Sequence, residues 1–156
     1  MPDPTSASHP PGQQFPAEPA PRHTSNGPGR VLVALYAVMA LAATGRSAVQ
    51  IIEYFSRAPL AYVLSAVAAV IYLIATYALI KGGPRMVALA RVSCTIELIG
   101  VLAIGTASNV VPQLFPDKTV WSHFGAGYGY LPLLLPVLGL WWLRRFTTSP
   151  RRGTSA

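Results

Sequence analysis

The sequence has few charged residues, and acidic residues are the scarcest of them. Asp, Glu, Lys and Arg make up 11% of the 156 residues, with five acidic residues against twelve basic ones. A soluble domain typically carries about 25% of these residues. Together with 52% hydrophobic residues and a mean hydropathy of +0.43, this composition excludes an ordinary soluble domain. It indicates an integral membrane protein, and the length favours a single domain.

Cysteine and histidine are also scarce. Cys94 is the only cysteine, which excludes an intrachain disulfide. The three histidines, His9, His23 and His123, are far apart in the sequence, so we expect neither a metal site nor a cofactor. The net charge of +7 would favour nucleic-acid binding in a soluble chain. Here most of the Lys and Arg residues flank apolar segments, so we expect the lipid bilayer as partner and no nucleic acid.

The two ends of the chain differ from its centre. Residues 1–29 hold eight of the fifteen prolines and little apolar surface, which predicts a disordered cytoplasmic tail. Residues 147–156 are predicted to form a basic cytoplasmic C-tail, and residues 30–146 a transmembrane domain. A cleaved signal peptide within 31–44 is the less favoured alternative, because a proline-rich segment of thirty residues would precede it.

Four apolar segments predict an all-α, four-helix transmembrane bundle. The clearest is 59–80, which is uncharged and has Pro59 at a favourable first helical position. The third is 86–108, and the fourth lies within 126–143, before Arg144 and Arg145. The first begins at Val31, but 31–44 alone spans roughly 21 Å, too short to cross a bilayer. We therefore expect this helix to continue through Arg46 to about Ile52.

Basic residues predict the orientation. They gather before the first span, between the second and third, and after the fourth: Arg22, Arg30, Lys81, Arg85, Arg144, Arg145, Arg151 and Arg152. The positive-inside rule then places both termini in the cytoplasm of a multi-pass protein of the cell membrane.

Polar residues follow one face of each of the first two predicted helices. The first face comprises Tyr36, Met39, Ala43, Arg46, Gln50, Glu53 and Arg57. The second comprises Tyr62, Ser65, Ala69, Tyr72 and Thr76. Steps of three and four residues place each set on one side of its helix, and we expect the two sides to face the bundle interior. Glu53 also precedes Arg57 by four residues, a favourable order for a helical ion pair.

Glu97 lies near the centre of the third span. Helix rise places it about 17 Å from the cytoplasmic end, and Arg46 about 23 Å along the first span. We therefore predict that Arg46 and Glu97 pair inside the bundle. A buried pair that fixes helix register is the favoured interpretation. The alternative is a proton or cation site, which intramembrane carboxylates often form.

The loop 109–125 offers a second candidate site. Asp117, Trp121 and His123 lie close together in the sequence, and Asp117 with His123 is a weak candidate for a ligand-facing polar pair. Trp121 and Phe124 fit the aromatic belt at the outer membrane interface. Ser122 next to His123 does not make a catalytic triad, because adjacent side chains do not pre-organise a nucleophile and its base.

Residues 45–47 (GRS), 58–62 (APLAY), 115–128 (FPDKTVWSHFGAGY) and 133–142 (LLLPVLGLWW) form a pattern that resembles small four-span membrane proteins of uncharacterised function in high-GC Gram-positive bacteria. The resemblance covers about 30–146 and implies a plasma-membrane protein, without an activity or functional residues.

The leading functional hypothesis is a non-enzymatic accessory or assembly subunit of a membrane complex. Such a protein would bind membrane-protein partners or form a homodimer through its helix faces. The alternative is a small proton-coupled transporter that uses Glu97, with Arg46 as the counter-charge. In that alternative Tyr36, Tyr62 and Tyr72 would line the path.

Overall fold

A computed structural model describes residues 27–146, which are all-α. Four α-helices and two short 3₁₀ helices follow in the order α1 Pro28–Tyr54, α2 Pro59–Lys81, α3 Pro84–Val110, η1 Pro112–Leu114, η2 Ser122–Tyr128 and α4 Leu131–Arg144. The predictions for 1–26 and 147–156 lie outside the described residues. The predicted tail 1–29 extends two residues too far, because α1 already begins at Pro28. The predicted helical bundle is confirmed.

Three helices, α1 to α3, are long and apolar enough to cross a membrane. A proline occupies the first turn of each, where its missing N–H costs no helical hydrogen bond. The first helix continues without a break through Gly45 and Arg46 to Tyr54, as its predicted length required. A fourth span results only if η2 and α4, which meet at a bend of 97°, are taken as one broken span.

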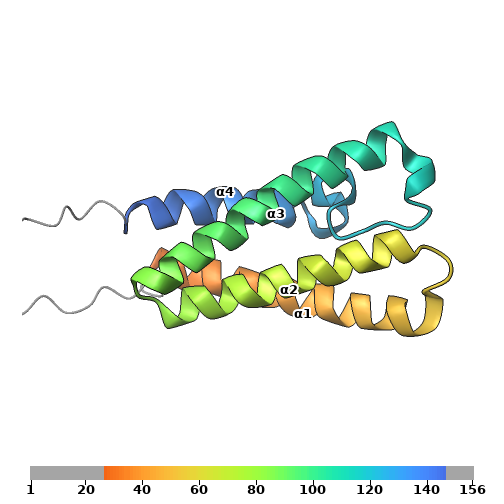
Figure 1. The fold of residues 1–156 in the computed structure, drawn as a ribbon. Coiled ribbons are helices and arrows are strands. Elements are labelled where there is room, and N and C mark those ends of the chain that lie inside the picture. The colour runs from red at the N-terminus through yellow and green to blue at the C-terminus, as the bar shows by residue number, and fades with distance from the viewer. Residues whose placement is uncertain (1–26, 147–156) are drawn as a thin grey trace, which may run out of the picture.

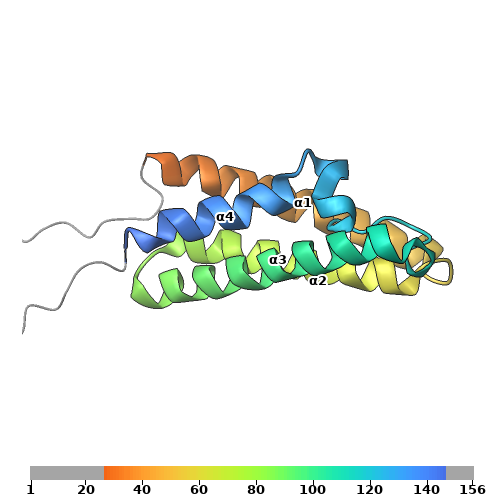
Figure 2. The same cartoon turned by 90° about the horizontal axis from the view of Figure 1, so that it is seen from above.

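The helices lie side by side along one long axis (Figure 1). The start of α1, the turn between α2 and α3, and the end of α4 share one end of the bundle, here called the basic end. The turn between α1 and α2 and the loop after α3 lie at the opposite end, here called the loop end. Seen from above, α4 lies between α1 and α3 (Figure 2).

The interior is packed with apolar side chains, and many large apolar side chains also cover the outside. Tyr36, Tyr72, Leu79, Leu135 and Leu143 are among the fully buried ones. Exposed apolar side chains occur along α1, α2 and α3, where a bilayer would cover them. This distribution fits a membrane-embedded bundle.

The fourth helix is shorter than the predicted 126–143 segment, because the chain before it turns through left-handed conformations. His123, Phe124 and Gly125 have φ angles of 51°, 59° and 80°, and Tyr130 has a φ of 61°. These values break a continuous helix. The fourteen residues of α4 span about 21 Å, and the preceding loop fills the remaining depth of the bundle at the loop end.

Candidate functional site

Glu97 is fully buried on α3 and contacts α1. Its Oε2 accepts a hydrogen bond of 2.8 Å from the hydroxyl of Tyr36, which is also fully buried. The Tyr36 oxygen lies 3.3 Å from the sulfur of Cys94. Since the single hydroxyl hydrogen of Tyr36 is given to Glu97, the thiol of Cys94 donates to the Tyr36 oxygen.

Tyr72 brings α2 to the same place. It is fully buried, its ring centroid lies 6.2 Å from that of Tyr36, and it interacts electrostatically with Glu97. Its hydroxyl accepts a hydrogen bond of 3.3 Å from Nε1 of Trp121 in the loop after α3. We call Tyr36, Tyr72, Cys94 and Glu97 the polar centre.

The fourth helix closes the polar centre on the remaining side. A Cβ atom added to Gly139 would lie 2.9 Å from the Cys94 sulfur and 3.6 Å from the Tyr36 hydroxyl. The backbone of α4 therefore approaches to a distance that only glycine permits. All four α-helices contribute to the enclosure of Glu97.

The predicted ion pair between Arg46 and Glu97 is wrong. Arg46 is exposed, and its Nη2 donates a 3.0 Å hydrogen bond to the backbone carbonyl of Lys118. Helix rise gives the depth of a residue but not its direction, and consecutive residues point about 100° apart. At this depth the buried residue is Ser47, with 4% exposure. Among residues 27–146, Arg57 and Asp117 form an ion pair, with 3.5 Å between Nε and Oδ2.

Glu97 therefore lies in the bundle without a cation beside it among the described residues. Its Oε1 is buried and has no hydrogen-bond partner there. Placing a carboxylate in such surroundings costs several kcal/mol unless other groups replace its lost hydration. One hydroxyl donor at Oε2 replaces only part of it. The polar centre thus holds an acidic group together with a free acceptor position.

The predicted polar face of α1 is correct only for its half nearer the basic end. Tyr36, Met39 and Ala43 are buried, whereas Gln50 is half-buried and Glu53 is exposed. Nearer the loop end, the buried face of α1 departs from the predicted face, since Ser47 and not Arg46 lies on the interior side.

The predictions for the face of α2 and for the end of α1 have different outcomes. Four of the five residues of the predicted face of α2, Tyr62, Ser65, Ala69 and Tyr72, are buried, and Thr76 is half-buried. The expected pair between Glu53 and Arg57 is wrong, because α1 ends at Tyr54. Arg57 therefore lies in the following turn rather than one helical turn beyond Glu53.

The loop after α3 does not bring Asp117 and His123 together as a pair. Asp117 accepts a hydrogen bond from the hydroxyl of Tyr62, and its Oδ2 lies 3.5 Å from Nε of Arg57. His123 Nδ1 lies 3.0 Å from Oδ1 of Asn109 on α3. Each residue thus fastens a different part of the loop to a different helix.

Trp121 is buried, with 3% exposure, so its predicted place in the outer aromatic belt is wrong. A tight turn directs it inward: the backbone N–H groups of Trp121 and Ser122 both donate to Oγ1 of Thr119. Its ring lies against Gly100 of α3, where a Cβ would come within 2.8 Å. Trp121 thus closes the interior of the bundle between Tyr72 and the loop end.

Cys94 and Gly139 also belong to the site, although the sequence did not lead us to predict them. Cys94 precedes Glu97 by three residues and therefore lies on the same helix face, a signal that the sequence contained. Gly139 stands inside an apolar run, and only the structure shows that Cys94 and Tyr36 lie beside it. Within residues 27–146, no group of three or more His, Cys, Asp or Glu side chains could hold a metal ion.

In comparisons with known proteins, no family model, no curated protein and no solved structure matches the chain.

Proposed function

We propose that the chain crosses the plasma membrane four times, with both termini on the cytoplasmic side. The basic end carries Arg30, Lys81, Arg85, Arg144 and Arg145 on described segments. The loop end carries fewer basic residues: Arg57, Lys118 and Arg46, whose guanidinium contacts the Lys118 carbonyl. The positive-inside rule supports placing the basic end in the cytoplasm.

Cysteine accessibility tests this orientation, with the buried Cys94 first replaced by alanine. Lys118→Cys and Arg85→Cys place one thiol at either end of the bundle. A membrane-impermeant maleimide added to intact cells is expected to label the first variant and not the second until the membrane is opened. The reverse pattern would contradict the orientation.

We further propose that the protein is a non-enzymatic, proton-binding membrane protein, a small proton carrier with Glu97 as its proton site. The observation that carries this proposal is the complete burial of Glu97 without a cation beside it among the described residues. A buried pair with Arg46 would have given the carboxyl a structural role. Intramembrane acids that lack such a partner commonly bind protons or ions.

The geometry assigns a role to each neighbour of Glu97. Tyr36 holds Oε2 by its hydrogen bond and fixes the direction of the carboxyl. Oε1, which has no partner among the described residues, is the position at which a proton binds. Tyr72, which interacts with Glu97, and Trp121 connect the polar centre to the loop after α3 by their mutual hydrogen bond. They mark the side of the bundle from which a proton would enter.

Proton flux into vesicles tests the proposal. The purified protein is reconstituted into liposomes that carry a pH gradient and a pH-sensitive dye. Wild type is expected to dissipate the gradient faster than empty vesicles, and Glu97→Gln is expected to be as slow as empty vesicles. The amide oxygen of Gln still accepts the hydrogen bond from Tyr36, so the fold is retained.

Glu53→Gln is the matched control, because it makes the same chemical change at an exposed carboxyl of α1. It is expected to retain the wild-type rate. Equal rates for wild type and Glu97→Gln, or a wild-type rate equal to that of empty vesicles, would overturn the proton-carrier proposal.

A second function, an accessory or assembly subunit of a membrane complex, is favoured by the closed packing around Glu97. The carboxyl has no exposed area, and Gly139 and Trp121 lie close against its neighbours. A static unit needs no opening to its polar centre. Gentle detergent extraction, native size separation and mass spectrometry test this function. Stoichiometric partners that remain after Glu97→Gln would support a subunit, and migration alone would favour the carrier.

A further inference from the structure

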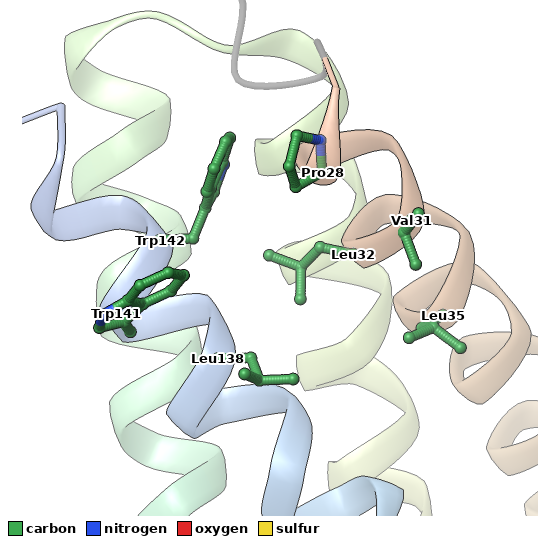
Figure 3. Close-up of a pocket in the computed structure, with 7 residues that line it drawn as sticks. All are labelled: Pro28, Val31, Leu32, Leu35, Leu138, Trp141 and Trp142. Atoms are coloured by element: carbon green, nitrogen blue, oxygen red, sulfur yellow. The ribbon is translucent and has the colours of Figure 1, made fainter.

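An apolar groove lies between α1 and α4 at the basic end (Figure 3). Pro28, Val31, Leu32 and Leu35 of α1 line one wall. Leu138, Trp141 and Trp142 of α4 line the other. The groove has a volume of about 140 Å³, and every lining side chain is apolar apart from the two indole N–H groups.

The groove runs in the direction in which a lipid chain lies. Pro28 is at the start of α1, and Leu35 lies seven residues further along the helix, which is about 10 Å towards the membrane centre. Apolar cavities of about 150 Å³ stay free of water and accept apolar guests. An apolar groove of this size therefore favours hydrocarbon over water as its occupant.

A positive charge stands at the mouth of the groove. The guanidinium carbon of Arg145 lies 4.1 Å from the ring centroid of Trp141 and 5.4 Å from that of Trp142. Arg145 is exposed, so its N–H donors remain available on the side away from the rings. Arg30, on the first turn of α1, is exposed at the same end of the bundle.

We propose that this groove binds one acyl chain of an anionic phospholipid, with its phosphate on Arg145. Charge complementarity at the membrane surface supports this occupant. The apolar groove accommodates the acyl chain, and Arg145, which contacts the rings of Trp141 and Trp142, lies at its mouth. The guanidinium group of arginine matches the geometry of a phosphate, and tryptophan is enriched at the headgroup level of membranes. A second copy of the chain or a helix of another protein in this groove would be a different outcome of the test.

Brominated lipids test the proposal, since bromine on an acyl chain quenches tryptophan fluorescence on contact. The full chain in detergent is titrated with a brominated phosphatidylglycerol or with a phosphatidylcholine that carries the same chains. Quenching is expected at a lower mole fraction of the anionic lipid, by about fivefold, which is roughly the contribution of one arginine near an anionic surface. Unbrominated phosphatidylglycerol should reverse it, and glycerol phosphate should not.

Two variants assign the effect to the groove. Arg145→Gln is expected to remove the preference for the anionic lipid. Val31→Phe is expected to fill the groove and reduce quenching at least severalfold. Val38→Phe is its matched control, because Val38 is also an exposed valine of α1 and does not line the groove; it should behave as wild type.

Other results would overturn the proposal. Equal quenching by the two brominated lipids would exclude a specific site for the anionic lipid. This comparison needs only the wild-type protein. Quenching that Val31→Phe leaves unchanged would remove the groove as the site. Protection from quenching that grows with protein concentration would show a second copy of the chain in the groove instead.

Discussion

Replacement of Tyr36 by phenylalanine tests the polar centre with the smallest change in shape. Tyr36 is fully buried, so Tyr36→Phe removes one hydroxyl and leaves the ring and its packing in place. The carboxyl of Glu97 then loses the donor at Oε2 while Oε1 already has no partner among the described residues. The thiol of Cys94 loses its acceptor at the same time.

The expected loss of stability follows from measured hydrogen bonds. Leaving a buried polar group without its partner costs about 1–3 kcal/mol in soluble proteins. Hydrogen bonds between membrane helices average about 0.6 kcal/mol and reach about 1.7 kcal/mol. Because Tyr36 serves two partners, we expect Tyr36→Phe to lower the free energy of unfolding by about 1–2 kcal/mol.

Unfolding by sodium dodecyl sulfate in mixed micelles, followed by circular dichroism, measures this loss. Tyr54→Phe is the control, because Tyr54 is 49% exposed at the end of α1. A surface change of this kind stays within about 0.5 kcal/mol. Equal unfolding of Tyr36→Phe and wild type would refute the hydrogen bond between Tyr36 and Glu97 as a stabilising contact.

Three further predictions concern the close approaches and the outer loop. Gly139→Ala is expected to lower the free energy of unfolding by about 1–3 kcal/mol, because its Cβ would meet the Cys94 sulfur. Gly45→Ala, with nothing within 4 Å of its Cβ, should not destabilise the bundle; equal losses in a detergent unfolding series would contradict the close approach of α4. Gly100→Ala is expected to displace the Trp121 ring and shift its fluorescence emission, whereas Gly127→Ala, which also meets nothing, should leave the emission unchanged. Arg57→Gln is expected to change the free energy of unfolding by less than about 1 kcal/mol, because the Arg57 side chain is 67% exposed; a larger loss would show that the ion pair with Asp117 fastens the loop.

The long helices could be predicted from the sequence because their causes are local. Apolar runs of sufficient length and a proline at each start determine α1, α2 and α3. The interior face of α2 followed from helical periodicity, since residues three and four apart share one side. These features depend on a few neighbouring residues and need no knowledge of the partner helix.

The contacts between helices could not be predicted in the same way. The depth of Arg46 was compatible with a pair to Glu97, but its rotation about the helix axis depends on how α1 packs on α2 and on the outer loop. Trp121 reaches Tyr72 across 49 residues of sequence, by a turn that depends on Thr119 and on left-handed residues after it. Periodicity contains no information on such contacts.

The central claim, that Glu97 binds a proton inside the bundle, has a direct spectroscopic test. Infrared difference spectra of the protein in a bilayer are recorded as the bulk pH is changed within the range in which the bundle stays folded. The account predicts a carboxyl band that changes with pH, is missing in Glu97→Gln and persists in Glu53→Gln. Spectra in which Glu97→Gln removes no pH-dependent carboxyl band would contradict it.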